Sequence, residues 1–141
     1  MTGTYSEIIS ITAPSSAREG EQVPISAEVM NISAYDLLFE IRLYAMRDIY
    51  EVPAPEEKIG TIEVTINSGQ SQVISGTFIM PAWDTTVLVM VYRFIDHWDF
   101  DVLGTKVVSL VVAQDWTPII GMVLVLGMVA VLIPMMKGGF K

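Results

Sequence analysis

The sequence predicts an all-β sandwich followed by one transmembrane α-helix. Two observations support this fold class. Before about residue 115, apolar residues recur with a period of two, and turn residues separate the alternating runs about every ten positions. From residue 116 to residue 136 the chain carries no charged residue. A helix over those residues would be roughly 31 Å long and would match the ~30 Å hydrocarbon core of a bilayer.

Each alternating run predicts one β-strand with an apolar face. In residues 22–31, Val23, Ile25, Ala27 and Val29 share one face, which we expect to point into the core. Residues 85–94 are apolar enough for that strand to be buried on both faces. The expected strands are 5–12, 22–31, 36–45, 58–66, 71–80, 85–94 and 103–113.

The segments between these runs have the composition of surface connections. Residues 46–57 include two prolines and four acidic residues, which excludes an interior strand. Residues 67–70 predict a hairpin turn, and residues 96–101 predict a charged, aromatic loop. Successive hairpins alternate between the two ends of a sandwich, and the last strand leads into the span. We therefore expect loops 15–21, 46–57 and 81–84 near the membrane and loops 32–35, 67–70 and 95–102 far from it.

About seven strands in this length are expected for an immunoglobulin-like β-sandwich. The segments EGEQVPISAEVMN, IRLYA and IGTIEVTINSGQSQVISGTFIMP resemble the adhesion-related Ig-like modules of CARDB type found on bacterial and archaeal surface proteins. The resemblance covers about residues 16–110 and includes Glu19-Gly20-Glu21, Asn31 and Gly69-Gln70-Ser71, which are turn and edge features. It implies a role in adhesion, spacing or assembly and no particular chemistry.

The charge distribution separates a domain (1–115) from the transmembrane helix (116–136) and a short basic tail (137–141). All 16 acidic residues and six of the eight basic residues precede the span, which leaves the domain with a net charge of −10. Lys137 and Lys141 follow it. An acidic domain argues against nucleic-acid binding, because phosphate neutralisation requires clustered Lys and Arg. The absence of cysteine excludes disulfides, thiolate zinc sites and a cysteine nucleophile.

The sequence gives opposing indications about the side of the membrane on which the domain lies. The first residues lack both a basic region and a continuous apolar run, so no cleavable signal peptide is visible. Either the sequence begins after processing, or the protein is anchored by its C-terminal span after synthesis. Anchoring through the C-terminal span after synthesis would leave the domain cytosolic. The positive-inside rule, applied to Lys137 and Lys141, would place it on the opposite side.

The most conspicuous candidate site is the stretch around His97, Trp98 and Phe100. An exposed aromatic residue there would anchor a protein partner, because Trp is enriched at binding hot spots. The alternative is that Trp98 folds back over the sandwich edge. Asp96, Asp99 and Asp101 could supply oxygen ligands to calcium, although their spacing does not match the EF-hand pattern.

Further candidates concern the membrane interface and glycosylation. Trp83 and Trp116 are expected near the headgroups, with Lys137 and Lys141 at the other boundary of the span. Alternatively, Trp83 closes the bottom of the core. Asn31-Ile32-Ser33 is a formal glycosylation sequon.

These features predict a non-enzymatic structural protein without a cofactor. The chain has no Gly-x-Ser-x-Gly elbow, His-Glu-x-x-His helix or phosphate-binding glycine loop. We expect membrane lipid and other structural proteins, of a capsid or an envelope, as partners in a larger ordered assembly. Our specific hypothesis is a single-pass minor virion protein that links capsid and membrane in an archaeal or bacterial virus. The alternatives are a cell-envelope adhesion or pilus-type subunit and an accessory subunit of a membrane enzyme complex.

Overall fold

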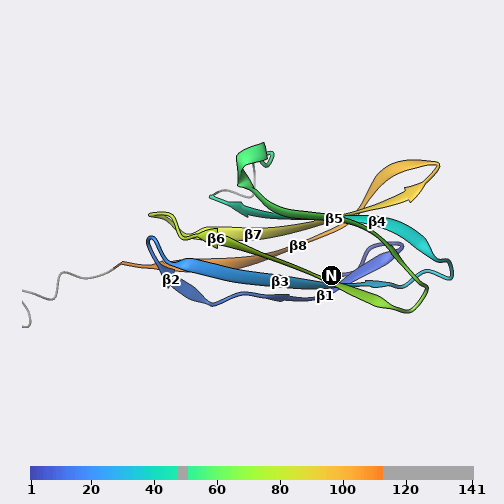
Figure 1. Cartoon of the computed structure of the whole chain (residues 1–141), viewed down its shortest axis with the longest axis horizontal. Helices are drawn as coiled ribbons and strands as arrows, with labels where there is room; N and C mark the ends of the chain where they lie inside the picture. Colours follow the sequence, from blue (N-terminus) through green and yellow to red (C-terminus); the bar gives the residue numbers. More distant parts are fainter. Residues whose placement is uncertain (48–50, 113–141) are drawn as a thin grey trace, which may run out of the picture. The chain divides into compact units, whose positions relative to one another are not determined.

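Two β-sheets face each other in the computed structural model, which describes residues 1–47 and 51–112 (Figure 1). The first sheet has three strands in the order β1-β3-β6, and the second has five in the order β2-β8-β7-β4-β5. The all-β prediction is confirmed. The strands are β1 (Ser6–Thr12), β2 (Ser16–Arg18), β3 (Gln22–Asn31), β4 (Leu37–Met46), β5 (Lys58–Ile66), β6 (Ser71–Ile79), β7 (Thr85–Ile95) and β8 (His97–Val111), and a 3-10 turn, η1 (Pro55–Glu57), precedes β5.

The core lies between the sheets and is built from the predicted alternation. The four apolar residues of β3 named above are at most 3% exposed, and Phe39, Ile41 and Leu43 of β4 are completely buried. Removing these side chains from water is the main force that holds the sheets together. β7 is buried on its inner face at Thr85, Val87, Val89 and Val91, but on its outer face only Leu88 is buried, so the prediction of burial on both faces holds only in part. Its outward Leu88 packs with Tyr44 and Met46 in a small second cluster on the outer face of the five-stranded sheet.

The described residues contain one strand more than the seven predicted, because the chain changes sheets near its beginning. β1 pairs with β3 as far as Thr12, and the chain then crosses through Pro14 to form β2, which pairs in parallel with β8. Pro14 fits this crossing, because it has no N–H to donate to a ladder. β2 has only three residues. Such a strand is too short to show a period of two in the sequence.

The prediction of a loop over residues 96–101 is wrong. β7 and β8 form one long hairpin that turns at Asp96, which adopts the left-handed conformation with φ 64°. Aspartate tolerates this conformation better than most residues. The aromatic residues Trp98 and Phe100 alternate with Asp99 and Asp101, so this stretch itself has the pattern of a strand. β8 therefore begins at His97 instead of residue 103.

The loops gather at the two ends of the sandwich in the predicted groups. The β3–β4 and β5–β6 connections lie at the same end of the sandwich as the β7–β8 turn, and we call it the hairpin end (Figure 1). There Ser68 donates hydrogen bonds to Ser33 and Asp36. We call the other end the exit end, because β8 ends there. At this end the Gly20 N–H donates to the Met80 carbonyl, and the Leu110 N–H donates to the Asp84 carboxylate. The predicted span, with Trp116, and the tail lysines lie outside the described residues. Within the described part of the chain, no helix is long and apolar enough to cross a bilayer.

Candidate interaction surface

Exposed aromatic side chains line the outer face of the β7–β8 hairpin. Phe94 lies opposite Trp98 and Tyr92 opposite Phe100 across the two strands. Both pairs meet edge to face, with ring centroids 5.3 Å and 5.8 Å apart. Phe94, Trp98 and Phe100 are 39%, 36% and 48% exposed. Aromatic pairs of this kind rigidify a hairpin while leaving much of each ring in solvent.

The same surface continues along β8. Leu103 lies opposite Met90 and is 45% exposed. We call the four aromatic residues and Leu103 the aromatic face. The sequence predicted His97, Trp98 and Phe100 as partner-binding residues. The structure brings Trp98 and Phe100 onto this face and places His97 at the turn. Tyr92, Phe94 and Leu103 were missed, because their strand pairing was not predicted.

An ion pair borders the aromatic face. Arg42 donates to Glu40 at 2.8 Å, and its guanidinium lies 4.3 Å from the centroid of the Tyr92 ring. The hydrogen bond to Glu40 raises the pKa of Arg42 further above its usual value, so the side chain stays cationic. A charged rim beside an apolar centre is the general arrangement of protein interfaces.

The charged groups of the hairpin mostly bind one another. Asp99 Oδ2 lies 3.1 Å from Arg93 Nη1 and 2.9 Å from His97 Nε2. Arg93 also lies 4.5 Å from the centroid of the Tyr5 ring. A His–Asp pair serves catalysis when the histidine reaches a nucleophile. No hydrogen bond among the described residues joins His97 to a hydroxyl group.

Asp101 fastens the beginning of the chain to β8. It is the extra residue of a β-bulge, since Val91 pairs with Val102 and Tyr92 with Phe100. Its carboxylate accepts the backbone N–H groups of residues 4, 5 and 6 and the hydroxyl of Ser6. Gly3 leaves room for it, because a Cβ at that position would lie 2.5 Å from Asp101 Oδ2. Both oxygens of the carboxylate are therefore already occupied by hydrogen bonds within the domain.

The structure does not bring the three calcium candidates together. Asp96 forms the turn, Asp99 binds Arg93 and His97, and Asp101 binds the first residues of the chain. Across residues 1–47 and 51–112, no group of three or more potential ligands is placed to hold a metal ion.

Asn31 is a core residue, which conflicts with its prediction as a glycosylation site. It is 0% exposed, and its Nδ2 donates to the carbonyls of Tyr35 and Ile66, both at 2.7 Å. Its Oδ1 accepts from the N–H and the hydroxyl of Ser33. The resemblance to CARDB modules already included Asn31. The structure gives the physical reason for an amide there, since it joins two loops of the hairpin end.

Trp83 lies in the loop between β6 and β7 at the exit end. It is 41% exposed and belongs to neither hydrophobic cluster, so it does not close the core. The guanidinium of Arg47 lies 4.6 Å from the centroid of a ring of Trp83. Its predicted place at a membrane interface stays a prediction.

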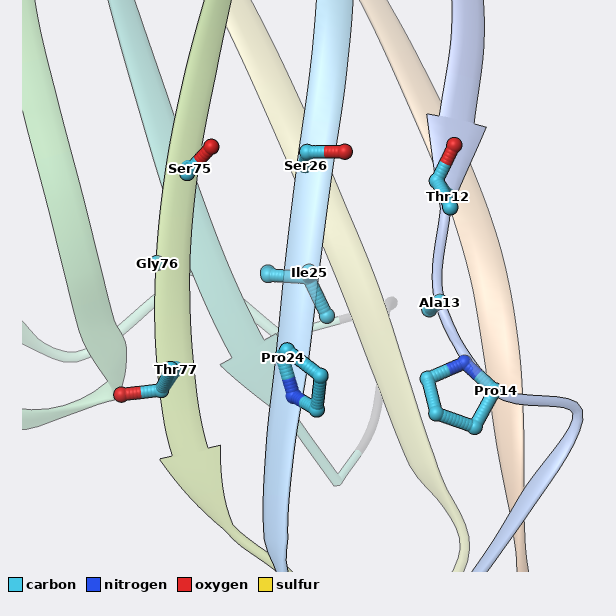
Figure 2. A pocket seen from close by; sticks show the side chains of 9 residues that line it. All are labelled: Thr12, Ala13, Pro14, Pro24, Ile25, Ser26, Ser75, Gly76 and Thr77. Atoms are coloured by element: carbon cyan, nitrogen blue, oxygen red, sulfur yellow. The ribbon is translucent and has the colours of Figure 1, made fainter.

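An open pocket of about 670 Å³ lies on the outer face of the three-stranded sheet (Figure 2). It forms because β1 leaves the sheet after Thr12, so that β3 has no neighbour on that side at Pro24, a residue without an N–H. No acid, base or aromatic residue lines it, which gives it no chemistry of its own. Its lining consists of Thr12, Ala13, Pro14, Pro24, Ile25, Ser26, Ser75, Gly76 and Thr77.

No family model matches the chain, and no curated protein is similar to it in sequence. Its fold is similar to that of solved structures. The CARDB domain of a Pyrococcus furiosus protein, in complex with di-metal ions, aligns with a TM-score of 0.57 and 12% identity over 79% of this chain and 93% of that chain. The C-terminal domain of wzt aligns with a TM-score of 0.50 and 10% identity, over 79% of this chain and 76% of that chain.

A β-glucosidase of Erythrobacter marinus also aligns, with a TM-score of 0.51 and 16% identity over 75% of this chain, but the match spans only 15% of the enzyme. At such identities the similarity concerns the fold and not the chemistry of the neighbours. The expected Ig-like sandwich of CARDB type is thereby confirmed at the level of the fold.

Proposed function

We propose that this protein is a non-enzymatic structural protein whose Ig-like domain binds another protein through the aromatic face. The observation that carries the proposal is the gathering of half-exposed aromatic side chains on one side of a rigid hairpin. Contiguous exposed apolar surface on a soluble domain usually marks an interaction site. Aromatic residues are also enriched at the centres of interfaces. A CARDB-like fold is compatible with an adhesion or interaction module.

The proposal includes a membrane anchor. Residues 116–136 form the span, and Trp116 and the tail lysines mark its two boundaries. Val112, the last described residue, precedes Trp116 by four residue steps, which reach at most about 14 Å. The exit end of the domain is therefore tethered close to the bilayer, and the aromatic face, at the opposite end of β8, is directed to a partner away from the membrane surface.

As the setting we propose a minor virion protein that links a capsid to an internal membrane in an archaeal or bacterial virus. The proposed C-terminal span motivates this choice, since a domain anchored through it after synthesis would face the cytosol, where capsids assemble. The second candidate is a cell-envelope adhesion or pilus-type subunit, which the CARDB-like fold favours. Protease treatment of intact cells separates the two, because an outward domain is cleaved and a cytosolic one is protected.

Site-specific photo-crosslinking tests the aromatic face. A crosslinking amino acid replaces Phe100 in the full chain, and native particles or membranes are irradiated. The matched control replaces Val73, which is 53% exposed on the three-stranded sheet. We expect a discrete heterologous product from position 100 and none from position 73. Equal labelling from both positions would remove the aromatic face as the binding site.

A further inference from the structure

The exit end carries a second group of exposed apolar side chains. Ile79, Val111 and Trp83 are 63%, 42% and 41% exposed. They lie at one end of the sandwich. Ile79 ends β6, Val111 ends β8, and the loop that carries Trp83 is tied to β8 through the Asp84–Leu110 hydrogen bond of 2.7 Å. These residues do not pack into the hydrophobic clusters.

The Arg47–Trp83 contact adds a cation to this apolar end. An indole prefers the headgroup layer of a bilayer, where its ring is partly dehydrated and its N–H stays hydrated. A guanidinium forms bidentate hydrogen bonds with phosphate. The Trp83 indole is therefore suited to the glycerol region of a phospholipid surface, and the Arg47 guanidinium is suited to its phosphates.

The path of the chain brings this end close to lipid. The headgroup layer of each leaflet is roughly 5–8 Å thick, and the link from Val112 to Trp116 reaches at most about 14 Å. Because the link is this short, the exit end is the part of the domain that stays nearest to the headgroups.

We infer that the exit end docks on the phospholipid surface through Trp83 and Arg47, supported by Ile79 and Val111, so that the domain is seated on the bilayer. This inference rests on the proposed membrane span. It concerns phospholipid headgroups in general and not anionic lipid in particular. Exposed Glu19, Glu51 and Glu56 belong to the loops of the same end and oppose a negative surface. Docking is therefore expected on phosphatidylcholine and is weakened by added phosphatidylserine.

The three tryptophans of the chain allow a direct test. The full-length protein is reconstituted in phosphatidylcholine vesicles, with and without lipid brominated near the headgroup end of its acyl chains. Three double variants each leave one tryptophan: W98F/W116F leaves Trp83, W83F/W116F leaves Trp98, and W83F/W98F leaves Trp116. Thermal unfolding of each variant shows that the domain is folded.

We expect bromolipid to quench Trp116 strongly and Trp83 by about half, while Trp98 at the hairpin end keeps almost all its emission. Adding R47Q to the Trp83 variant should reduce the quenching of Trp83 without affecting the fold, because Arg47 is exposed. If Trp116 is not quenched, the proposed span is wrong. If Trp116 is quenched but Trp83 behaves like Trp98, the span stands and the docking inference is overturned.

Discussion

The two ends of the sandwich use their polar residues differently. At the hairpin end, side chains bind the backbone in dense groups: Asp101 holds the first residues of the chain, and Asn31 joins two loops. At the exit end, single contacts connect Asp84 with Leu110 and Glu21 with Arg18. The loops of the hairpin end contain no Lys or Arg, whereas Arg18, Arg47 and Lys58 belong to the exit end.

This difference teaches that acidic side chains near a strand turn need not form a ligand site. Asp99 pairs with Arg93, and Asp101 accepts hydrogen bonds from the first residues of the chain. The exposed side chains of this hairpin are mainly aromatic. The exit end keeps an exposed cation next to an exposed indole. The hairpin end therefore suits a protein partner, and the exit end suits a surface with phosphate groups.

The largest change in the free energy of unfolding is expected for N31A, which removes the buried hydrogen bonds of Asn31 at the hairpin end. The variant removes the side-chain donor to the buried carbonyl of Ile66 and one of the two donors to the carbonyl of Tyr35. It also removes the acceptor of the Ser33 N–H and hydroxyl, so the free energy of unfolding should fall by about 3 kcal/mol. Urea denaturation measures this change. The exposed Asn67 of the same end provides the control, and N67A should change the free energy by less than about 0.5 kcal/mol. Similar values for both variants would contradict a structural role for Asn31.

D101N should cost about 2 kcal/mol of unfolding free energy. The amide keeps the size of the side chain but loses the charge and one acceptor oxygen, so the N–H groups of Thr4, Tyr5 and Ser6 lose part of their bonding. Amide hydrogen exchange should show faster exchange at these three positions. E63Q, an exposed neutralisation on β5, is the matched control and should leave their exchange unchanged. Unaltered exchange in D101N would show that Asp101 does not hold this segment.

D84A tests the exit end, because it removes the exposed hydrogen bond between the Leu110 N–H and Asp84. Loss of the bond to the Leu110 N–H should lower the free energy of unfolding by about 1 kcal/mol. E56A, in the same end but without that contact, should have almost no effect. If D84A proved as costly as N31A, the contrast between a densely bonded end and a loosely bonded end would not hold.

Most of the strands could be predicted from the sequence, because burial of one sheet face imposes a period of two. β3 and β5 have the predicted bounds, and the predicted inward residues of β3 are in the core. β2 could not be found, because its pairing with β8 depends on where the chain crosses between sheets. The same crossing at Pro14 creates the open pocket, which has no signature in any local pattern.

The candidate site was predicted in part. The concentration of aromatic and acidic residues correctly drew attention to Trp98 and Phe100. The partners of the aspartates could not be predicted, because Arg93 lies across the hairpin and Ser6 is far away in sequence. The sequon at Asn31 shows the same limit, since a motif of three residues carries no information on whether its first residue is buried.

The smallest effect is expected for H97Q, which tests whether the turn is free for a partner. His97 is 71% exposed at its side chain, and its contact with Asp99 is screened by water, so the free energy of unfolding should change by less than about 0.5 kcal/mol. Urea denaturation at low and high salt should give the same small value. A loss as large as that of D84A would mean that the Arg93–Asp99–His97 contacts hold the hairpin together. Variants of the aromatic face would then alter the shape of the hairpin as well as its binding surface, and crosslinking from position 100 would have to be compared at equal stability.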